Sequence, residues 1–201
     1  MSGLVGALHN RLVFDRRTRV LAAHLSELLP PDANVLDVGC GDGTIDALIQ
    51  QRRPDLSIRG IDVLLRPETH IPVEQFDGTT FPAADNSIDA VTFVDVLHHT
   101  KDPLVLLREA RRVARQLIVI KDHTCDGPLA YGRLRLMDWV GNAHHNVVLP
   151  YNYWPEQRWR AAFAELELEP VAWRTDVGLY PFPVSAVFDS SLHVVTALRV
   201  A

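Results

Sequence analysis

Hydrophobic residues recur along the chain at two spacings, one typical of strands and one typical of helices. Short apolar runs predict seven strands, at residues 34–38, 56–62, 72–76, 90–94, 116–120, 170–177 and 192–200. Helical spacing predicts helices at residues 4–29, 45–51, 103–113 and 156–168, the first of which is one helix or two. This order of elements predicts an α/β fold in which the last two strands form an antiparallel pair.

The first predicted strand, residues 34–38, runs into a turn that contains Gly39, Gly41 and Gly43. Glycines let the backbone bend sharply and approach a ligand closely, and the helix after the turn begins with free N–H groups. The spacing disfavours a dinucleotide site, because Thr44 stands where the third glycine of G-x-G-x-x-G is required. It also disfavours a phosphate-binding P-loop, because Gly-Lys-Ser/Thr does not follow Gly43.

The segment from Val35 to Thr44 resembles the first motif of class I S-adenosylmethionine-dependent methyltransferases, D-x-G-x-G-x-G. The resemblance implies a Rossmann-like, seven-stranded and mostly parallel sheet with an antiparallel last strand and helices on both faces. It also implies that S-adenosylmethionine is the cofactor and lies beside Asp37, Gly39, Cys40 and Gly41.

Two acids follow the next two predicted strands. Asp62 ends one strand, where a carboxylate can accept hydrogen bonds from both ribose hydroxyls, although a helix N-cap is the alternative. Asp77 and Gly78 follow the next, and the resemblance implies that this acid accepts from the adenine amino group while backbone N–H groups meet a ring nitrogen. The alternative is an Asp-Gly turn without a ligand. Val63 is included with these cofactor-binding residues.

Residues 81–91 resemble the segment that enters the fourth strand in the small-molecule, type 11-like branch of these methyltransferases. In that family the residues after the fourth strand line the methionine portion of the cofactor and the methyl-transfer channel. The resemblance therefore places Asp95 and Val96 at the cofactor. His98 is a candidate base, and its alternative is to cap the following turn.

Asp122 and His123 lie at the carboxyl end of the fifth predicted strand, where open α/β sheets bind ligands. We expect His123 to remove a proton from the acceptor, with Asp122 as its orienting partner or as an alternative base. The alternative is that both residues close the strand. With His144 and His145 they offer metal-binding atoms, but no helical spacing supports such a site, so we predict no metal.

We expect one domain over residues 1–201, because no linker or repeat interrupts the chain. Within it, residues 123–154 are aromatic and longer than a plain connection, which predicts a cover over an apolar or ring-containing substrate. The aromatic side chains can equally be core. The apolar link at 178–184 closes the substrate pocket or packs against another subunit, so a homodimer is one expected assembly.

The composition limits the classes of molecule that the protein is expected to bind. The net charge of −5 and a pI near 6.0 lack the basic surplus typical of nucleic-acid binding. No apolar run reaches the length of a membrane span, so we expect a cytoplasmic protein without stable membrane insertion. The two cysteines form no C-x-x-C pair, which disfavours a disulfide framework or a zinc site.

The resemblance implies transfer of a methyl group from S-adenosylmethionine to a small-molecule or lipid-like acceptor, on O, N or C, leaving S-adenosylhomocysteine. Such catalysis is mostly alignment, and a base is required when the acceptor arrives protonated. An aminopropyl transferase would need additional acids for its polycationic amine. A non-catalytic S-adenosylmethionine-binding regulatory or partner-binding module is the alternative that the sequence leaves open.

Overall fold

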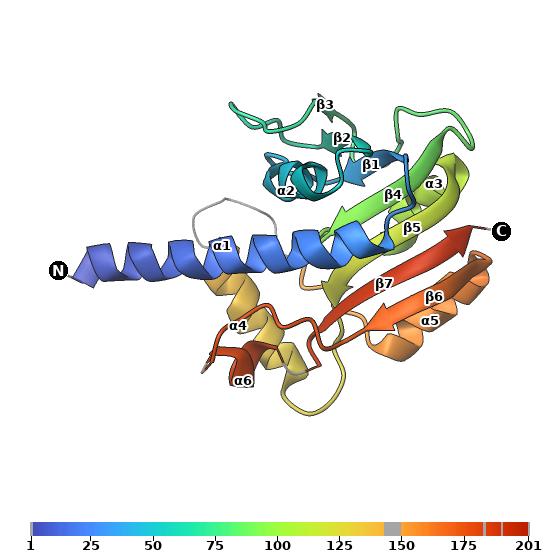
Figure 1. Ribbon diagram of the computed structural model, residues 1–201. Helices are drawn as coiled ribbons and strands as arrows, with labels where there is room; N and C mark the ends of the chain where they lie inside the picture. The colour runs from blue at the N-terminus through green and yellow to red at the C-terminus, as the bar shows by residue number, and fades with distance from the viewer. Residues whose placement is uncertain (1, 143–149, 183, 190, 201) are drawn as a thin grey trace.

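The computed structural model describes residues 2–142, 150–182, 184–189 and 191–200 (Figure 1). The elements follow in the order α1 (Ser2–Leu28), β1 (Asn34–Val38), α2 (Thr44–Arg52), β2 (Ser57–Asp62), β3 (Val73–Gln75), β4 (Ile88–Val94), η1 (Leu97–His99), α3 (Pro103–Val113), β5 (Ala114–His123), α4 (Ala130–Asn142), α5 (Glu156–Glu165), β6 (Leu168–Arg174), α6 (Val184–Phe188) and β7 (His193–Val200). The strands form one sheet of order β3-β2-β1-β4-β5-β7-β6.

Strand direction decides where the ends of the strands meet. β1 pairs in parallel with β2 and β4, and β3 and β5 extend the parallel part on either side. β7 runs antiparallel to both β5 and β6. The predicted seven-stranded, mostly parallel sheet with an antiparallel last strand is therefore confirmed. The carboxyl ends of β1 to β5 lie along one edge, which we call the carboxyl edge.

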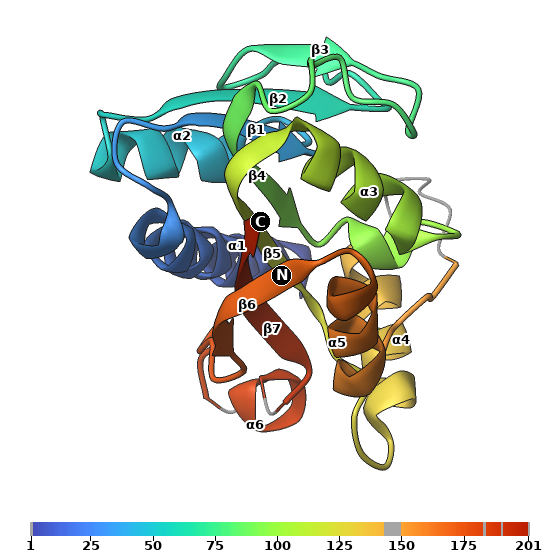
Figure 2. The same ribbon diagram turned by 90° about the vertical axis from the view of Figure 1, so that its right-hand side faces the viewer.

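Helices cover both faces of the sheet, as Figure 2 shows with α1 and α2 on one side and α3 and α5 on the other. Leu25 of α1 and Ile49 of α2 belong to one buried cluster with Ile58 of β2. Leu107 of α3 belongs to the opposite cluster with Val91 of β4. Strand residues on both faces are buried, which explains why these strands appear as nearly continuous apolar runs in the sequence.

The ends of several helices and strands are set by specific interactions. The predicted helix at 4–29 is the single helix α1. Asp102 caps α3, since its carboxylate accepts a hydrogen bond from Leu104 N at 3.0 Å. β5 extends further than predicted, because Asp122 and His123 pair with Val194 and His193 of β7. These two polar residues are therefore part of the strand, a pairing that the local sequence does not reveal.

Leu107 and Val105 offer a matched test of the α3 packing. Leu107 is fully buried against the sheet, whereas Val105, on the same helix, is 37% exposed. We expect Leu107→Ala to lower the free energy of unfolding by about 2–5 kcal/mol, because it removes buried methyl groups and leaves a cavity. Val105→Ala should cost less than about 1 kcal/mol. Urea unfolding of both variants checks this, and equal losses would contradict the packing described.

Candidate functional site

The glycine turn after β1 has three glycines in the left-handed region of the backbone. Gly39, Gly41 and Gly43 adopt φ angles of 74°, 61° and 75°, which favour glycine. A Cβ atom on Gly39 would lie 2.6 Å from Val96 Cγ2, and one on Gly43 would lie 2.4 Å from Ile71 Cγ1. A Cβ on Gly41 would meet no atom within 4 Å. The turn is thus closely packed at its ends and open at Gly41.

Asp62, at the end of β2, binds the glycine turn directly. Its Oδ2 accepts a hydrogen bond from Gly41 N at 2.9 Å, and its Oδ1 accepts one from Leu64 N at 2.9 Å. Gly39 N also donates to Ile61 O at 2.7 Å. No helix follows Asp62 before β3 in this described part of the chain, so the carboxylate is not a helix N-cap. It joins the open part of the turn to the second strand.

Val63 and Gly78 bring the ends of β2 and β3 together. A Cβ atom on Gly78, whose φ is 84°, would lie 3.2 Å from Val63 Cγ1. The neighbouring Asp77 is exposed, and its Oδ1 accepts hydrogen bonds from Thr80 N and Thr79 N at 2.7 Å each, which lower the pKa of this carboxyl. Asp77 therefore stabilises a turn, as the alternative interpretation expected. A carboxylate has two oxygens, so a ligand contact stays compatible with this role.

Asp37 and Cys40 lie beneath the glycine turn. Asp37 is 4% exposed and accepts a hydrogen bond from Thr92 of β4. Burial raises its pKa from 3.8 to about 7, and burial together with the neighbouring Asp37 raises the pKa of Asp46 on α2. The Cys40 side chain packs over Gly60, and burial raises its thiol pKa. These residues pack against the turn and against β4, whereas no atom lies within 4 Å of where a Cβ on Gly41 would be.

Asp95 connects three elements at the carboxyl edge. It follows β4 with a φ of 57°, and its carboxylate binds both Lys121 of β5 and Arg17 of α1. Burial opposes ionisation of Asp95, but these two cations hold its pKa well below the usual value. Lys121 is fully buried, which lowers its pKa. The sequence did not identify Arg17, because helical periodicity does not show which strand end a helix crosses.

Asp122 is the most fully engaged carboxylate at this edge. It is completely buried and accepts hydrogen bonds from Leu97 N at 3.0 Å and from His123 N at 2.7 Å. Its Oδ1 also lies 2.6 Å from Nδ1 of His98, which is 2% exposed. The ring partner of Asp122 is therefore His98 rather than the expected His123.

His123 contributes an uncharged ring. Burial and the neighbouring Lys121 ammonium hold its pKa well below the usual value. Its Nδ1 lies 3.3 Å from Leu192 O, and its ring centroid lies 4.6 Å from that of His98 and 5.0 Å from that of His193. The imidazoles of η1, β5 and β7 thus form one buried cluster.

Asp95, His98, Asp122 and His123 place possible metal-ligating atoms within 4.8 Å of one another. In this arrangement the carboxylates are already engaged, which disfavours binding of a metal ion. Asp95 already neutralises two cations, and the oxygens of Asp122 accept hydrogen bonds from backbone N–H groups and from His98. The expectation of no metal stays a prediction, and His144 and His145 lie outside the described residues.

Two neighbouring aromatic residues near the end of the segment 123–154 pack in different places. Trp154 packs in the core, with its ring centroid 4.8 Å from that of Trp159. Tyr153 instead stacks beside the His98 ring at 5.8 Å and contacts Tyr131 of α4 at 5.9 Å. Aromatic side chains of this segment therefore lie against the histidine cluster.

The link at 178–184 packs partly within its own chain. Leu179 is fully buried in a cluster with Leu21 of α1 and Val195 of β7. Phe182 is 85% exposed. A short helix, α6, which the sequence did not predict, begins at the end of this link.

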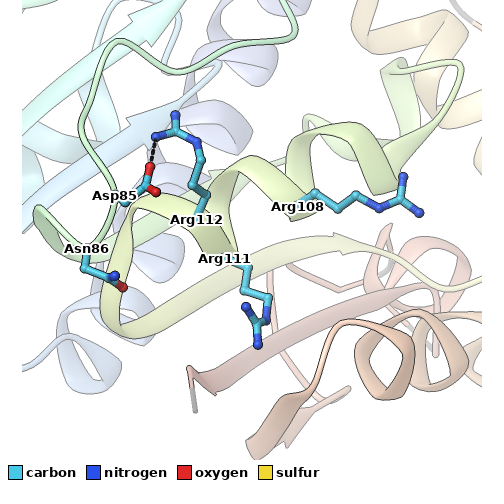
Figure 3. Close-up of a pocket in the computed structure, with 5 residues that line it drawn as sticks. All are labelled: Asp85, Asn86, Arg108, Arg111 and Arg112. Atoms are coloured by element: carbon cyan, nitrogen blue, oxygen red, sulfur yellow. Dashed lines mark hydrogen bonds and ion pairs between the residues drawn. The ribbon is translucent and has the colours of Figure 1, made fainter.

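A hollow of about 380 Å³ lies at the C-terminal end of α3, near the amino ends of β4 and β5 (Figure 3). It is lined by Asp85, Asn86, Arg108, Arg111 and Arg112. Acidic side chains bind the three guanidinium groups at 2.9, 2.7 and 2.7 Å, and Figure 3 draws the pair of Arg112 and Asp85. Because its charges are paired and it lies away from the carboxyl edge, this hollow is separate from the candidate site.

Comparison with known proteins adds independent findings. Residues 10–172 match a family model described as a methyltransferase domain. A demethylmenaquinone methyltransferase of Renibacterium salmoninarum is 31% identical over 147 residues, which cover 63% of this chain and 62% of that protein. The chain spans less than two thirds of the length of the curated relatives that it matches. No helix in the described ranges is long and apolar enough to cross a bilayer.

Solved structures share the fold at low sequence identity. The Haloferax volcanii partner of the Trm112 methyltransferase activator is 15% identical with a TM-score of 0.68, over 96% of this chain and 93% of that one. Geranyl diphosphate C-methyltransferase from Streptomyces coelicolor A3(2), solved with Mg²⁺, geranyl-S-thiolodiphosphate and S-adenosyl-L-homocysteine, is 17% identical with a TM-score of 0.65, over 90% of this chain and 75% of that one. These likenesses confirm the Rossmann-like fold.

The buried carboxyl of Asp37 predicts a pH-dependent stability. Its pKa in the folded protein, about 7, lies above the ordinary 3.8, so its contribution is fully present below pH 3.8 and is lost as the pH rises through about 7. One proton gives a slope of at most about 1.4 kcal/mol per pH unit. We expect Asp37→Asn to remove this contribution, because an amide does not titrate.

The measurement is urea unfolding at several pH values between about 4.5 and 7.5. Asp37 also raises the pKa of Asp46, so the difference between wild type and Asp37→Asn reports both neighbouring carboxyls. Asp176→Asn, at an exposed position, is the matched control and should follow the wild type. A pH-independent difference between wild type and Asp37→Asn would contradict the raised pKa.

Proposed function

The chain belongs to the methyltransferase-domain family, and we propose that it transfers the methyl group of S-adenosylmethionine to a small-molecule or lipid-like acceptor. The observation that carries this proposal is the hydrogen bond of 2.9 Å between Asp62 Oδ2 and Gly41 N. It places a carboxylate, suited to a ribose, directly on a turn whose open glycine allows a ligand to approach.

The residues along the carboxyl edge fit the three parts of this cofactor. Asp62 would hold the ribose, and the adjoining Val63, Asp77 and Gly78 would hold the adenine. The methionine portion would lie beside Gly39, Gly41, Asp95 and Val96. The cofactor supplies an activated methyl group on a sulfonium, so the protein's task is to align the acceptor and to exclude water.

A small-molecule acceptor is supported by charge and by the relatives. The net charge of −5 disfavours nucleic acid as a substrate. Two of the similar proteins are named for small acceptors, demethylmenaquinone and geranyl diphosphate. The aromatic side chains near His98 are suited to an apolar or ring-bearing molecule.

The ribose assignment predicts a variant that folds but does not bind the product. We expect S-adenosylhomocysteine at about 100 times its Kd to raise the Tm of the wild type by roughly 5–10 °C. Asp62→Ala should remove this shift, because the ribose hydroxyls lose their acceptor. Asp55→Ala is the matched control, since Asp55 lies before the opposite end of β2 and pairs with Arg53. An unaltered shift in Asp62→Ala would refute the assignment.

Turnover separates an enzyme from a non-catalytic cofactor-binding module. We expect the wild type to transfer label from methyl-tritiated S-adenosylmethionine to compounds in the small-molecule fraction of a cell extract, and Asp62→Ala to transfer at least about 100-fold less. Label in organic-soluble products, counted after chromatography, is the measurement. Tight binding of the labelled cofactor without any transfer across extracts would favour the binding module.

A further inference from the structure

We propose that His98 is the general base of this reaction, oriented by Asp122, and that the acceptor presents a phenolic or enolic hydroxyl. The inference rests on the proposed methyl transfer and goes beyond it, because it names the group that is deprotonated and the class of acceptor.

The position of Asp122 fixes which nitrogen of His98 accepts a proton. Backbone N–H groups of Leu97 and His123 donate to the carboxylate at 3.0 and 2.7 Å, which holds its orientation. An ionised carboxylate accepts hydrogen bonds and donates none, so His98 Nδ1, at 2.6 Å, carries the hydrogen. The lone pair of the neutral ring is then on Nε2, the atom that can take a proton from an acceptor.

The surroundings favour His98 over His123 as this base. When His98 takes a proton, the buried carboxylate of Asp122 stabilises the resulting imidazolium. The Nδ1 of His123 lies instead at 3.3 Å from a neutral carbonyl, Leu192 O, and the Lys121 ammonium opposes protonation of its ring. His123 Nε2 does lie 3.6 Å from Asp95 Oδ1, but that carboxylate is already bound by Lys121 and Arg17. Asp122 Oδ1 lies closer to its histidine, at 2.6 Å from His98 Nδ1, so a protonated His98 has the better counter-ion.

The side chains around His98 indicate the kind of molecule that brings the proton. The centroids of the His99, His123 and Tyr153 rings lie at 4.0, 4.6 and 5.8 Å from that of His98, so aromatic rings at different tilts surround it. His98 is 2% exposed, so water competes little for its nitrogen, and the acceptor enters by displacing cover residues such as Tyr153. A ring-bearing acceptor replaces such contacts with similar ones.

The charges around His98 and the acidity of each possible acceptor group indicate which kind of atom is methylated. Among the described residues of the cluster, Asp95 is bound by Lys121 and Arg17, and Asp122 is bound by His98. Both carboxylates are therefore engaged, which disfavours binding of a cationic amine. A thiol loses its proton near neutral pH with little help, whereas a phenol with a pKa of about 10 keeps it. An imidazole base is of most use for such a hydroxyl.

The step balances without a further reactant. The hydroxyl proton passes to His98 Nε2 while an oxygen lone pair forms the new O–CH₃ bond. The S–CH₃ bond breaks, and its electron pair stays on sulfur. The products are a methyl ether, S-adenosylhomocysteine and an imidazolium paired with Asp122, which afterwards releases its proton to solvent.

The test compares acceptors that need a base with acceptors that do not. Wild type, His98→Gln and Asp122→Asn are assayed at pH 7.5 with labelled S-adenosylmethionine on 4-methylphenol, whose pKa is about 10, and on 4-nitrophenol, which is largely ionised. Thiophenol and benzylamine complete the panel. Binding of S-adenosylhomocysteine is measured in parallel, and His70→Gln, at an exposed position before β3, is the control.

We expect both dyad variants to lose about 10²–10⁴-fold in kcat with 4-methylphenol and less than about tenfold with 4-nitrophenol, while product binding is unchanged. His70→Gln should follow the wild type. Equal losses on both phenols, or no loss, would overturn the base assignment. If Asp122→Asn fails to fold, His98→Gln decides alone.

Failure of this inference differs from failure of the proposed function. Transfer by the wild type to thiophenol or benzylamine but to neither phenol would overturn the acceptor class and leave methyl transfer standing. Transfer to none of the four compounds would overturn the acceptor class as well, and the extract assay would then decide on methyl transfer. A wild type that does not bind S-adenosylhomocysteine would refute the proposed function itself.

Discussion

The carboxyl edge of the sheet is organised by the need to compensate buried charge. A charged side chain removed from water is costly unless a counter-ion or several hydrogen bonds replace its hydration. Asp95 is bound by two cations, and Asp122 accepts from backbone N–H groups and from His98. Asp37 meets the same constraint differently, since burial raises its pKa toward neutrality. Each of these carboxylates contacts a neighbouring helix or strand, so the same contacts also determine the shape of the site.

The glycine turn is connected to this edge at three points. Gly39 packs against Val96, which follows Asp95 along the chain, and Gly41 donates to Asp62 at the end of β2. From below, Asp37 links the turn to β4 through Thr92. The cofactor residues and the histidine cluster are therefore parts of one packed arrangement. A methyl donor at the turn and an acceptor at His98 would meet where β4 and β5 end side by side.

Cofactor and acceptor are recognised by different kinds of structure. The residues proposed for the cofactor lie on a turn and on strand ends of the parallel part of the sheet. The residues proposed for the acceptor come from separate segments, namely η1, the end of β5, the start of β7 and Tyr153. The glycine motif therefore identifies the family, whereas individual side-chain contacts indicate the acceptor.

The sequence by itself determined the seven strands, four of the helices and the glycine motif, because apolar periodicity and glycine spacing are local properties. It did not predict the short helices η1 and α6. Tertiary structure alone decided which side chains meet. The pairing of β5 with β7 drew Asp122 and His123 into a strand, and the path of α1 brought Arg17 to Asp95. His98 rather than His123 received the carboxylate of Asp122, although Asp122 and His123 are adjacent in sequence. Adjacent strand residues point to opposite faces, so only the folded chain selects the partner.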